Sequence, residues 1–277
     1  MPGVRIVTDS AADLPAPLVG ELGITVVPLE VRLGDADPAT TTALSAAEFW
    51  ELTVSTGELA QTAAPSPGAF AEAFAEAARS GAAAVVCVTL SAGLSATYQA
   101  AVAGARSAEI PVVVVDSTTV TMGEGFVVLD AADAAAKGGD LEAVRAAAQE
   151  STATVTVTGA LGGLDALRRG GRIGAAQAFF GSLLSIKPIV EIRGGVVVGE
   201  SRQRTRARSL RYLVDMARNA GPLRRVAVAH GAATDLDEFV AMLEAALPDV
   251  EILVTYIGPV IGAHAGPGTI GLCMQRS

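Results

Sequence analysis

The sequence predicts an α/β protein with two domains: an N-terminal domain built on a parallel sheet and a C-terminal α+β domain. In the first half of the chain, short apolar strands alternate with helical patterns. An Asp-Ser pair follows two of these strands, at residues 9–10 and 116–117. Polar residues gathered at strand ends indicate the carboxyl edge of a parallel sheet, where ligands bind. Beyond residue 150 the alternation changes, and Gly194-Gly195 between two apolar segments predicts a hairpin.

The first half carries local signals for its elements. Ser45 and Glu48 form a capping box, and Ser66 followed by Pro67 begins another helix. Pro28 lies inside an extended segment and indicates a bulge or an edge there, because proline cannot donate to a central ladder. We expect strands at residues 4–7, 24–33, 82–88 and 111–115, and helices at residues 15–22, 45–52, 66–77, 95–101 and 122–137.

The second half predicts an α+β domain. A short helix lies between two glycine pairs, at residues 162–163 and 170–171, and Thr234 is expected to cap a later helix. We expect strands at residues 153–158, 186–193, 196–199, 226–229, 250–257 and 269–274, and helices at residues 164–169, 175–184, 205–220 and 234–247. We place the boundary near residue 158, so the domains span residues 1–158 and 159–277.

Composition excludes several classes of protein. Of the 277 residues 51% are hydrophobic, yet no run of about 18 apolar residues could span a bilayer. The first residues lead directly into a strand pattern, so we expect no signal peptide. Cys87 and Cys273 lie in separate apolar stretches, which favours buried thiols in a cytoplasmic protein. The net charge of −9 disfavours binding to nucleic acid.

The stretch at residues 82–101 joins a strand to a helix through a hydroxyl-rich elbow, residues 89–95. The first N–H groups of a helix lack intrahelical partners and carry partial positive charge, so hydroxyls beside them form a cradle for an anion. The same residues fit a helix that Ser95 simply caps. The elbow therefore suggests an anionic ligand group without identifying it.

Three catalytic or nucleotide-binding motifs are weak or absent. Residues 266–271 match the letters of the dinucleotide fingerprint, but the chain ends at Ser277, too early for the helix and acidic residue that should follow. No P-loop sequence occurs. A serine hydrolase could combine Ser95 with His264 and an aspartate, but the nucleophile-elbow motif requires glycine where Thr97 stands.

His264 lies in a glycine-rich segment, residues 258–268. Glycines let the backbone approach a ligand closely, and an imidazole there can donate to a carboxylate or a phosphate. The alternative is a loop histidine that bonds to the backbone. The other histidine, His230, follows a strand and is expected to be structural.

Five arginines concentrate positive charge in this acidic chain: Arg202, Arg204, Arg206, Arg208 and Arg211. A solvated helix face is the ordinary fate of such a run. Because arginine binds phosphate bidentately, the run also fits a docking surface for an acidic or nucleotide-carrying partner.

Six segments, in this order along nearly the whole chain, together resemble the DegV family. They are residues 7–10 (Val-Thr-Asp-Ser), 62–67, 94–98, 115–117, 168–173 and 258–268. The chain departs from the family pattern at Ala63, where a serine is usual, and at Ala96, where a glycine is usual. The first departure removes a hydroxyl from the expected site, whereas the second leaves the elbow small.

The resemblance implies a two-domain protein that holds one long-chain, palmitate-like fatty acid between its domains. In related bacterial systems such a protein presents the carboxyl group to a separate ATP-binding fatty acid kinase subunit, which forms an acyl phosphate. Carried across by motif, Thr62 and Ser95 would hold the carboxylate, with His264 and Arg172 completing the network. The resemblance implies no catalytic residues, cofactor or metal of the chain's own, and it is compatible with transient membrane contact.

We expect Arg202 and Arg204 to contact the kinase partner. Burial of a palmitate-length chain would supply about 10 kcal/mol, at ~0.8 kcal/mol per methylene. The alternatives are a serine hydrolase that acts on an acyl ester through Ser95, and a regulator that binds phosphate or a nucleotide.

Overall fold

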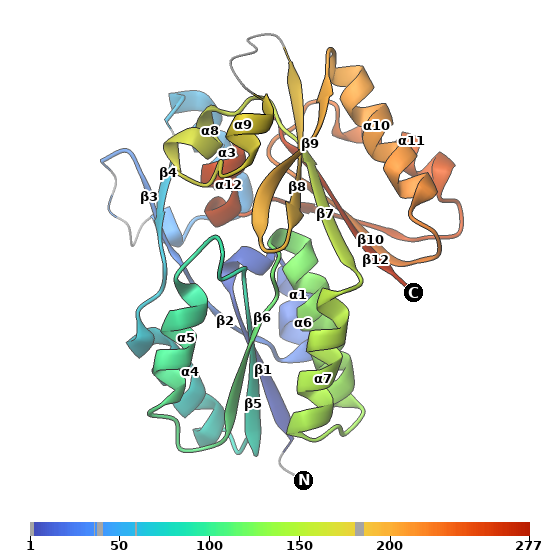
Figure 1. Cartoon of the computed structure of the whole chain (residues 1–277). Helices are drawn as coiled ribbons and strands as arrows, with labels where there is room; N and C mark the ends of the chain where they lie inside the picture. Colours follow the sequence, from blue (N-terminus) through green and yellow to red (C-terminus); the bar gives the residue numbers. More distant parts are fainter. Residues whose placement is uncertain (1–2, 36, 38–40, 59, 181–185) are drawn as a thin grey trace.

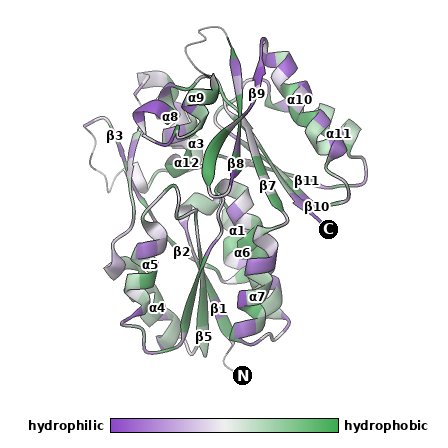
Figure 2. Ribbon diagram, in the orientation of Figure 1, coloured by the Kyte–Doolittle hydropathy of each residue, from purple (hydrophilic) through white to green (hydrophobic). Residues whose placement is uncertain are grey.

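The N-terminal sheet has four parallel strands in the order β2-β1-β5-β6 (Figure 1). The computed structural model describes residues 3–35, 37, 41–58, 60–180 and 186–277. The strands are β1 (Val4–Asp9), β2 (Thr25–Val27), β5 (Ala84–Thr89) and β6 (Val112–Asp116). Every residue of β5 is buried, as expected for a central parallel strand covered on both faces, and Figure 2 shows its hydrophobic character.

Helices cover both faces of this sheet (Figure 1). On one face, Phe70 and Phe74 pack in one cluster with Val85, and on the other Val128 packs with Val86. The successive strand residues Val85 and Val86 thus point to opposite faces. The helices of this part are η1 (Ser10–Ala12), α1 (Ala16–Leu22), α4 (Pro67–Arg79), α5 (Thr97–Ala105), α6 (Thr121–Ala136) and α7 (Leu141–Thr152).

The second sheet has six strands in the order β11-β10-β12-β7-β8-β9. They are β7 (Val155–Ala160), β8 (Lys187–Arg193), β9 (Val196–Gln203), β10 (Leu223–His230), β11 (Ile252–Tyr256) and β12 (Ile270–Arg276). Helices α10 (Arg206–Asn219) and α11 (Leu236–Ala246) cover one face, where Leu210 and Phe239 pack with Val228. The other face meets the N-terminal domain, since Ala227 packs in one cluster with Phe126 of α6.

A segment of the first half of the chain packs against the second. Strands β3 (Glu30–Leu33) and β4 (Ala60–Ala63) form an antiparallel ribbon, and α3 (Ala46–Thr56) lies between them in sequence. Trp50 of α3 donates from Nε1 to the carbonyl of Ile257, at 2.7 Å. That carbonyl lies just before α12 (Pro259–Ala265). The remaining short helices are α8 (Asp165–Arg169) and α9 (Ala176–Phe180).

The predicted fold class is confirmed: a parallel sheet at the N-terminus is followed by a separate mixed sheet. The capping box at Ser45 and Glu48 is present, and Gly194 and Gly195 form the β8–β9 turn with φ of 59° and 78°. The predicted division near residue 158 falls within β7, all of whose described pairing is inside the second sheet. None of the described helices combines the length and apolarity needed to cross a bilayer.

Several element predictions were wrong. Residues 24–33 form two strands in different sheets rather than one, with Pro28 between them and the Leu29 N–H donating to Ser10 Oγ at 2.9 Å. Helices α7 and α12 were not predicted. The residue that precedes α11 is Asp235 rather than Thr234. The last part of the helix expected at residues 175–184 lies outside the described residues.

Candidate functional site

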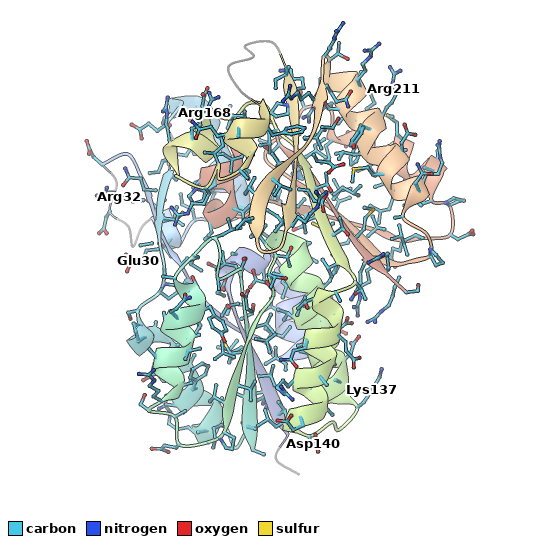
Figure 3. The ribbon with its side chains drawn as sticks, in the orientation of Figure 1. Glu30, Arg32, Lys137, Asp140, Arg168 and Arg211 are labelled. Atoms are coloured by element: carbon cyan, nitrogen blue, oxygen red, sulfur yellow. The ribbon has the colours of Figure 1, made fainter. Side chains whose placement is uncertain are left out.

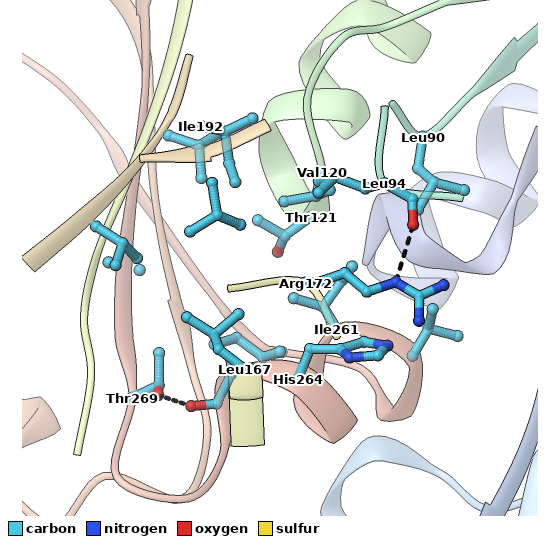
Figure 4. A pocket seen from close by; sticks show the side chains of 18 of the residues that line it. Leu90, Leu94, Val120, Thr121, Leu167, Arg172, Ile192, Ile261, His264 and Thr269 are labelled. Carbon is cyan, nitrogen blue, oxygen red and sulfur yellow. Dashed lines mark hydrogen bonds between the residues drawn. The ribbon is translucent and has the colours of Figure 1, made fainter. Parts of the chain in front are cut away.

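A largely apolar cavity lies between the two domains. Its volume of about 110 Å³ is several times the roughly 10–15 Å³ that one water requires. The aliphatic lining comes from both halves of the chain: Leu29, Leu90, Leu94, Val120, Val157, Leu161, Leu167, Val190, Ile192, Val197, Ile257, Val260 and Ile261. Apolar cavities hold water poorly and accept apolar ligands. The lining therefore suits an aliphatic occupant (Figure 4).

The four residues expected to hold a carboxylate all line this cavity: Thr62, Ser95, Arg172 and His264. Thr62 Oγ1 and His264 Nε2 are hydrogen-bonded at 2.9 Å. Arg172 donates from Nε to the carbonyl of Leu94 at 3.1 Å, the dashed line beside it in Figure 4. The structure thus brings together side chains from four separate segments of the sequence.

Two glycines allow the close contacts that position the His264 side chain. His264 belongs to the last turn of α12, so the alternative of a loop histidine does not hold. A Cβ at Gly262 would lie 2.7 Å from Trp50 Cζ2, and one at Gly170 would lie 2.1 Å from His264 Nδ1. Glycine at these two positions therefore lets α12 pack against α3 and lets the imidazole lie against the end of α8.

The imidazole of His264 is neutral at physiological pH. Burial lowers its pKa to about 4, and the positive charge of Arg172 contributes in the same direction. Its Nδ1 is buried and has no hydrogen-bond partner among the described residues. A neutral imidazole offers one N–H donor, so Arg172 supplies the positive charge and His264 one directed hydrogen bond.

Ser95 is not arranged as an activated nucleophile. Its hydroxyl accepts the Thr97 N–H at 3.3 Å and is hydrogen-bonded to Thr97 Oγ1 at 2.8 Å, whereas His264 bonds to Thr62. A nucleophilic serine needs a base within hydrogen-bond reach. The residue that directly precedes α5 is Ala96, so Ser95 lies one position before the cap position that the alternative interpretation gave it.

Two aspartates hold the elbow in place, a role that was not predicted from the sequence. Asp9 accepts from the Leu90 N–H and the Ala11 N–H, each at 2.9 Å. Asp116 accepts from the Ala92 N–H at 3.1 Å. The signal was present in the two Asp-Ser pairs, because each aspartate is the last residue of a strand that flanks β5.

Three carboxyl groups are buried near this edge of the sheet. Burial raises the pKa of Asp9 and of Asp13 to about 7, and that of Glu124 well above its usual range. The Thr8 hydroxyl donates to Glu124 Oε1 at 3.2 Å. The nearby Asp9 raises the pKa of Glu124 further, since a negative charge on Asp9 opposes ionisation of Glu124. The folded protein therefore retains protons here that an unfolded chain would lose.

The arginines expected to bind a partner lie apart from the cavity lining. Arg202 on β9 is exposed, and its guanidinium stacks 4.7 Å from the centre of the Phe179 ring. Arg204 is exposed just before α10, and Arg211 projects from α10 at the outer surface (Figure 3).

Arg206 differs from these arginines because it is engaged within the fold. It forms a bidentate ion pair with Asp235, with N–O distances of 2.7 and 2.9 Å, and also donates to the carbonyl of Ala160. The basic run therefore divides into a structural arginine and exposed ones.

The fold and the site define a class: a two-domain α/β protein with an apolar interdomain cavity whose wall carries hydroxyls, an imidazole and a guanidinium. A family model described as "Uncharacterised protein, DegV family" matches residues 3–277. The chain belongs to the DegV family.

Related proteins match this chain over nearly its whole length. A DegV domain-containing protein of Streptomyces coelicolor is 40% identical over 276 residues, covering 98% of each chain. A DegV family protein from Thermus thermophilus, described with fatty acid binding, is 32% identical, with a TM-score of 0.86 over 99% of this chain and 100% of the other. DegV of Bacillus subtilis, described as a fatty acid binding protein, is 30% identical, with a TM-score of 0.88 over 100% of both chains.

The buried carboxyls predict that the protein becomes less stable as pH rises from 6.5 to 8. Unfolded Asp and Glu lose their protons near pH 4, so the folded state binds more protons above that pH, and deprotonation through about pH 7 costs stability. His264 has the opposite effect between about pH 4 and pH 6.5, because its folded-state pKa is lowered, so the measurement begins at pH 6.5. The expected loss is on the order of 1 kcal/mol per carboxyl, measured by urea unfolding.

Glu124→Gln keeps an acceptor for Thr8 and should flatten this pH dependence. The exposed residue Glu150 provides the control, since Glu150→Gln should leave the slope unchanged. A wild-type stability that stays constant or rises from pH 6.5 to 8 would contradict the assignment of these protons.

Proposed function

We propose that the protein binds one long-chain fatty acid in the interdomain cavity. The observation that carries the proposal is the aliphatic cavity with Thr62, Ser95, Arg172 and His264 on its wall. The relatives from Thermus thermophilus and Bacillus subtilis, both described with fatty acid binding, share the fold over the whole chain and support it.

Affinity and orientation come from different parts of the ligand in this proposal. A palmitate-length chain gains on the order of 10 kcal/mol from burial, at ~0.8 kcal/mol per methylene. Each hydrogen bond to the charged head group adds about 1.5–3 kcal/mol. The aliphatic walls would therefore supply most of the affinity, and the polar side chains would fix where the carboxylate lies.

The carboxylate would accept hydrogen bonds from three kinds of donor: two hydroxyls, a guanidinium and an imidazole. The hydroxyls of Thr62 and Ser95 can turn to donate, and the guanidinium of Arg172 supplies a positive charge. His264 starts neutral and donates from one ring nitrogen, and the negative charge of a bound carboxylate would raise its pKa.

We further propose that the protein presents the carboxyl group to a separate ATP-binding kinase subunit, which forms the acyl phosphate. The pairing of Ser95 with Thr97 and of His264 with Thr62 supports a binding role for these residues rather than hydrolysis of an acyl ester. Arg202 and Arg204 are exposed cations that a nucleotide-carrying partner could contact.

Removal of either head-group hydroxyl should weaken fatty acid binding. We expect Thr62→Ala and Ser95→Ala each to raise the Kd for palmitate by about 10- to 100-fold, because each loses about 1.5–3 kcal/mol. Calorimetric titration with the delipidated protein measures it. Thr234→Ala removes an exposed hydroxyl on the second domain and serves as the control. Unchanged affinity in both site variants would refute the head-group assignment.

The partner role predicts that ATP-dependent formation of acyl phosphate requires both proteins. The wild-type chain alone should form none, and adding the ATP-binding subunit should restore it. Arg204→Ala should raise the concentration of this chain needed for half-maximal rate several-fold, whereas Arg218→Ala, an exposed cation at the far end of α10, should not. Acyl phosphate made by the isolated chain, or no effect of Arg204→Ala, would contradict this role.

A further inference from the structure

The turn of the β8–β9 hairpin reaches from the second sheet to the N-terminal domain. In Figure 1 the lower end of the hairpin lies beside the start of α6 and the end of the N-terminal sheet. The hairpin pairs with β7 through β8 alone, and β9 is the edge strand of its sheet. Beyond Ile192 the described ladder joins β8 and β9 only to each other, so the tip extends past β7.

The contact at the tip is close and fully buried on one side. Ser91 of the elbow is 0% exposed, and its hydroxyl donates to the carbonyl of Gly195 at 2.6 Å. A Cβ at Gly93 would lie 2.6 Å from that same carbonyl oxygen. The hairpin backbone thus lies directly on the elbow backbone, and a glycine is required at the point of contact.

The elbow side of this contact is rigidly held. The Ser91 N–H donates to the carbonyl of Thr119 at 2.9 Å, and the Ala92 N–H donates to Asp116. The Ser91 hydroxyl also accepts the Gly93 N–H at 3.2 Å. Movement at the contact would therefore be movement of the hairpin.

Both sides of the contact form walls of the cavity. The hairpin contributes Val190, Ile192 and Val197, and the elbow contributes Leu90, Leu94 and Ser95. Separation of the tip from Ser91 would part these two walls and open the cavity.

We propose that Ser91 is a positioning residue that latches the β8–β9 hairpin across the cavity through the Gly195 carbonyl, and thereby sets how fast a bound ligand leaves. Ser91 itself does not line the cavity, so it acts through the hairpin. The ligand is the long-chain fatty acid of the proposed function. The prediction about its release rate therefore rests on that function, whereas the latch contact does not.

Two variants weaken the latch by different means. Ser91→Ala removes the donor and leaves the Gly195 carbonyl without this hydrogen bond, and Gly93→Ala keeps the donor but pushes the carbonyl away. We expect each to speed release of a fluorescent fatty acid to excess acceptor vesicles by about tenfold in a stopped-flow experiment, as for the loss of one buried hydrogen bond. Ser107→Ala removes a similar hydroxyl-to-carbonyl bond at the end of α5 and should leave the rate unchanged.

Hydrogen exchange of the ligand-free protein separates the latch from the proposed function. In both latch variants the amides of residues 187–203 should exchange faster, whereas those of β1 and β5 should not. Unchanged exchange in the hairpin, or an unchanged release rate in both variants, would overturn the latch. Faster hairpin exchange in a protein that takes up no fatty acid would support the latch and refute the proposed function.

Discussion

The apolar contact between α6 and the inner face of the second sheet holds the two domains together, and the cavity exists because this contact covers only part of the interface. Phe126 and Met122 of α6 pack there with Ala227 and Cys273. At the rim, Arg225 bonds to Asp130 and Asp133 of α6, and Gln275 bonds to Asp130 and Ser151. Together these interactions fix the domains while leaving the aliphatic space beside the elbow unfilled.

The polar side chains of the site are far apart in the sequence. They meet at one cavity only because the two domains pack in this way. Thr62 comes from a ribbon that crosses to the second domain, Ser95 from the elbow, and His264 from α12. Trp50 connects these parts, since it bonds to Ile257 and packs against Gly262. The position of the elbow also depends on contacts between distant residues, since the buried Asp9 accepts the Leu90 N–H of the elbow and the Ala11 N–H of η1.

Local chemistry made much of the fold predictable from the sequence. Capping at Ser45 and Ser66 and the Gly194-Gly195 turn act over a few residues, and the structure has them where the pattern places them. The splitting of residues 24–33 was not predictable in this way, because it depends on a hydrogen bond from Leu29 to Ser10 across nineteen positions. Helix α12 was missed because glycines mask its pattern, although Pro259 at its start was a usable signal.

The site was predictable only in part. Local patterns indicated an anion-binding elbow that includes Ser95 and a ligand role for His264. Thr62 and Arg172 were assigned only through the resemblance to the DegV family. The spacing of these four residues along the chain gave no indication that they meet at one cavity. The contact of Ser91 with Gly195 spans 104 positions and has no local signature. Such contacts follow from how the two sheets pack, which no short pattern encodes.

Occupancy of the cavity is tested most directly by native mass spectrometry of the purified protein, followed by denaturation, organic extraction and analysis of the released fatty acids. We expect one fatty acid per chain, retained in the native ion and lost on denaturation. A protein that is empty, and that takes up no long-chain fatty acid when one is added, would contradict this expectation.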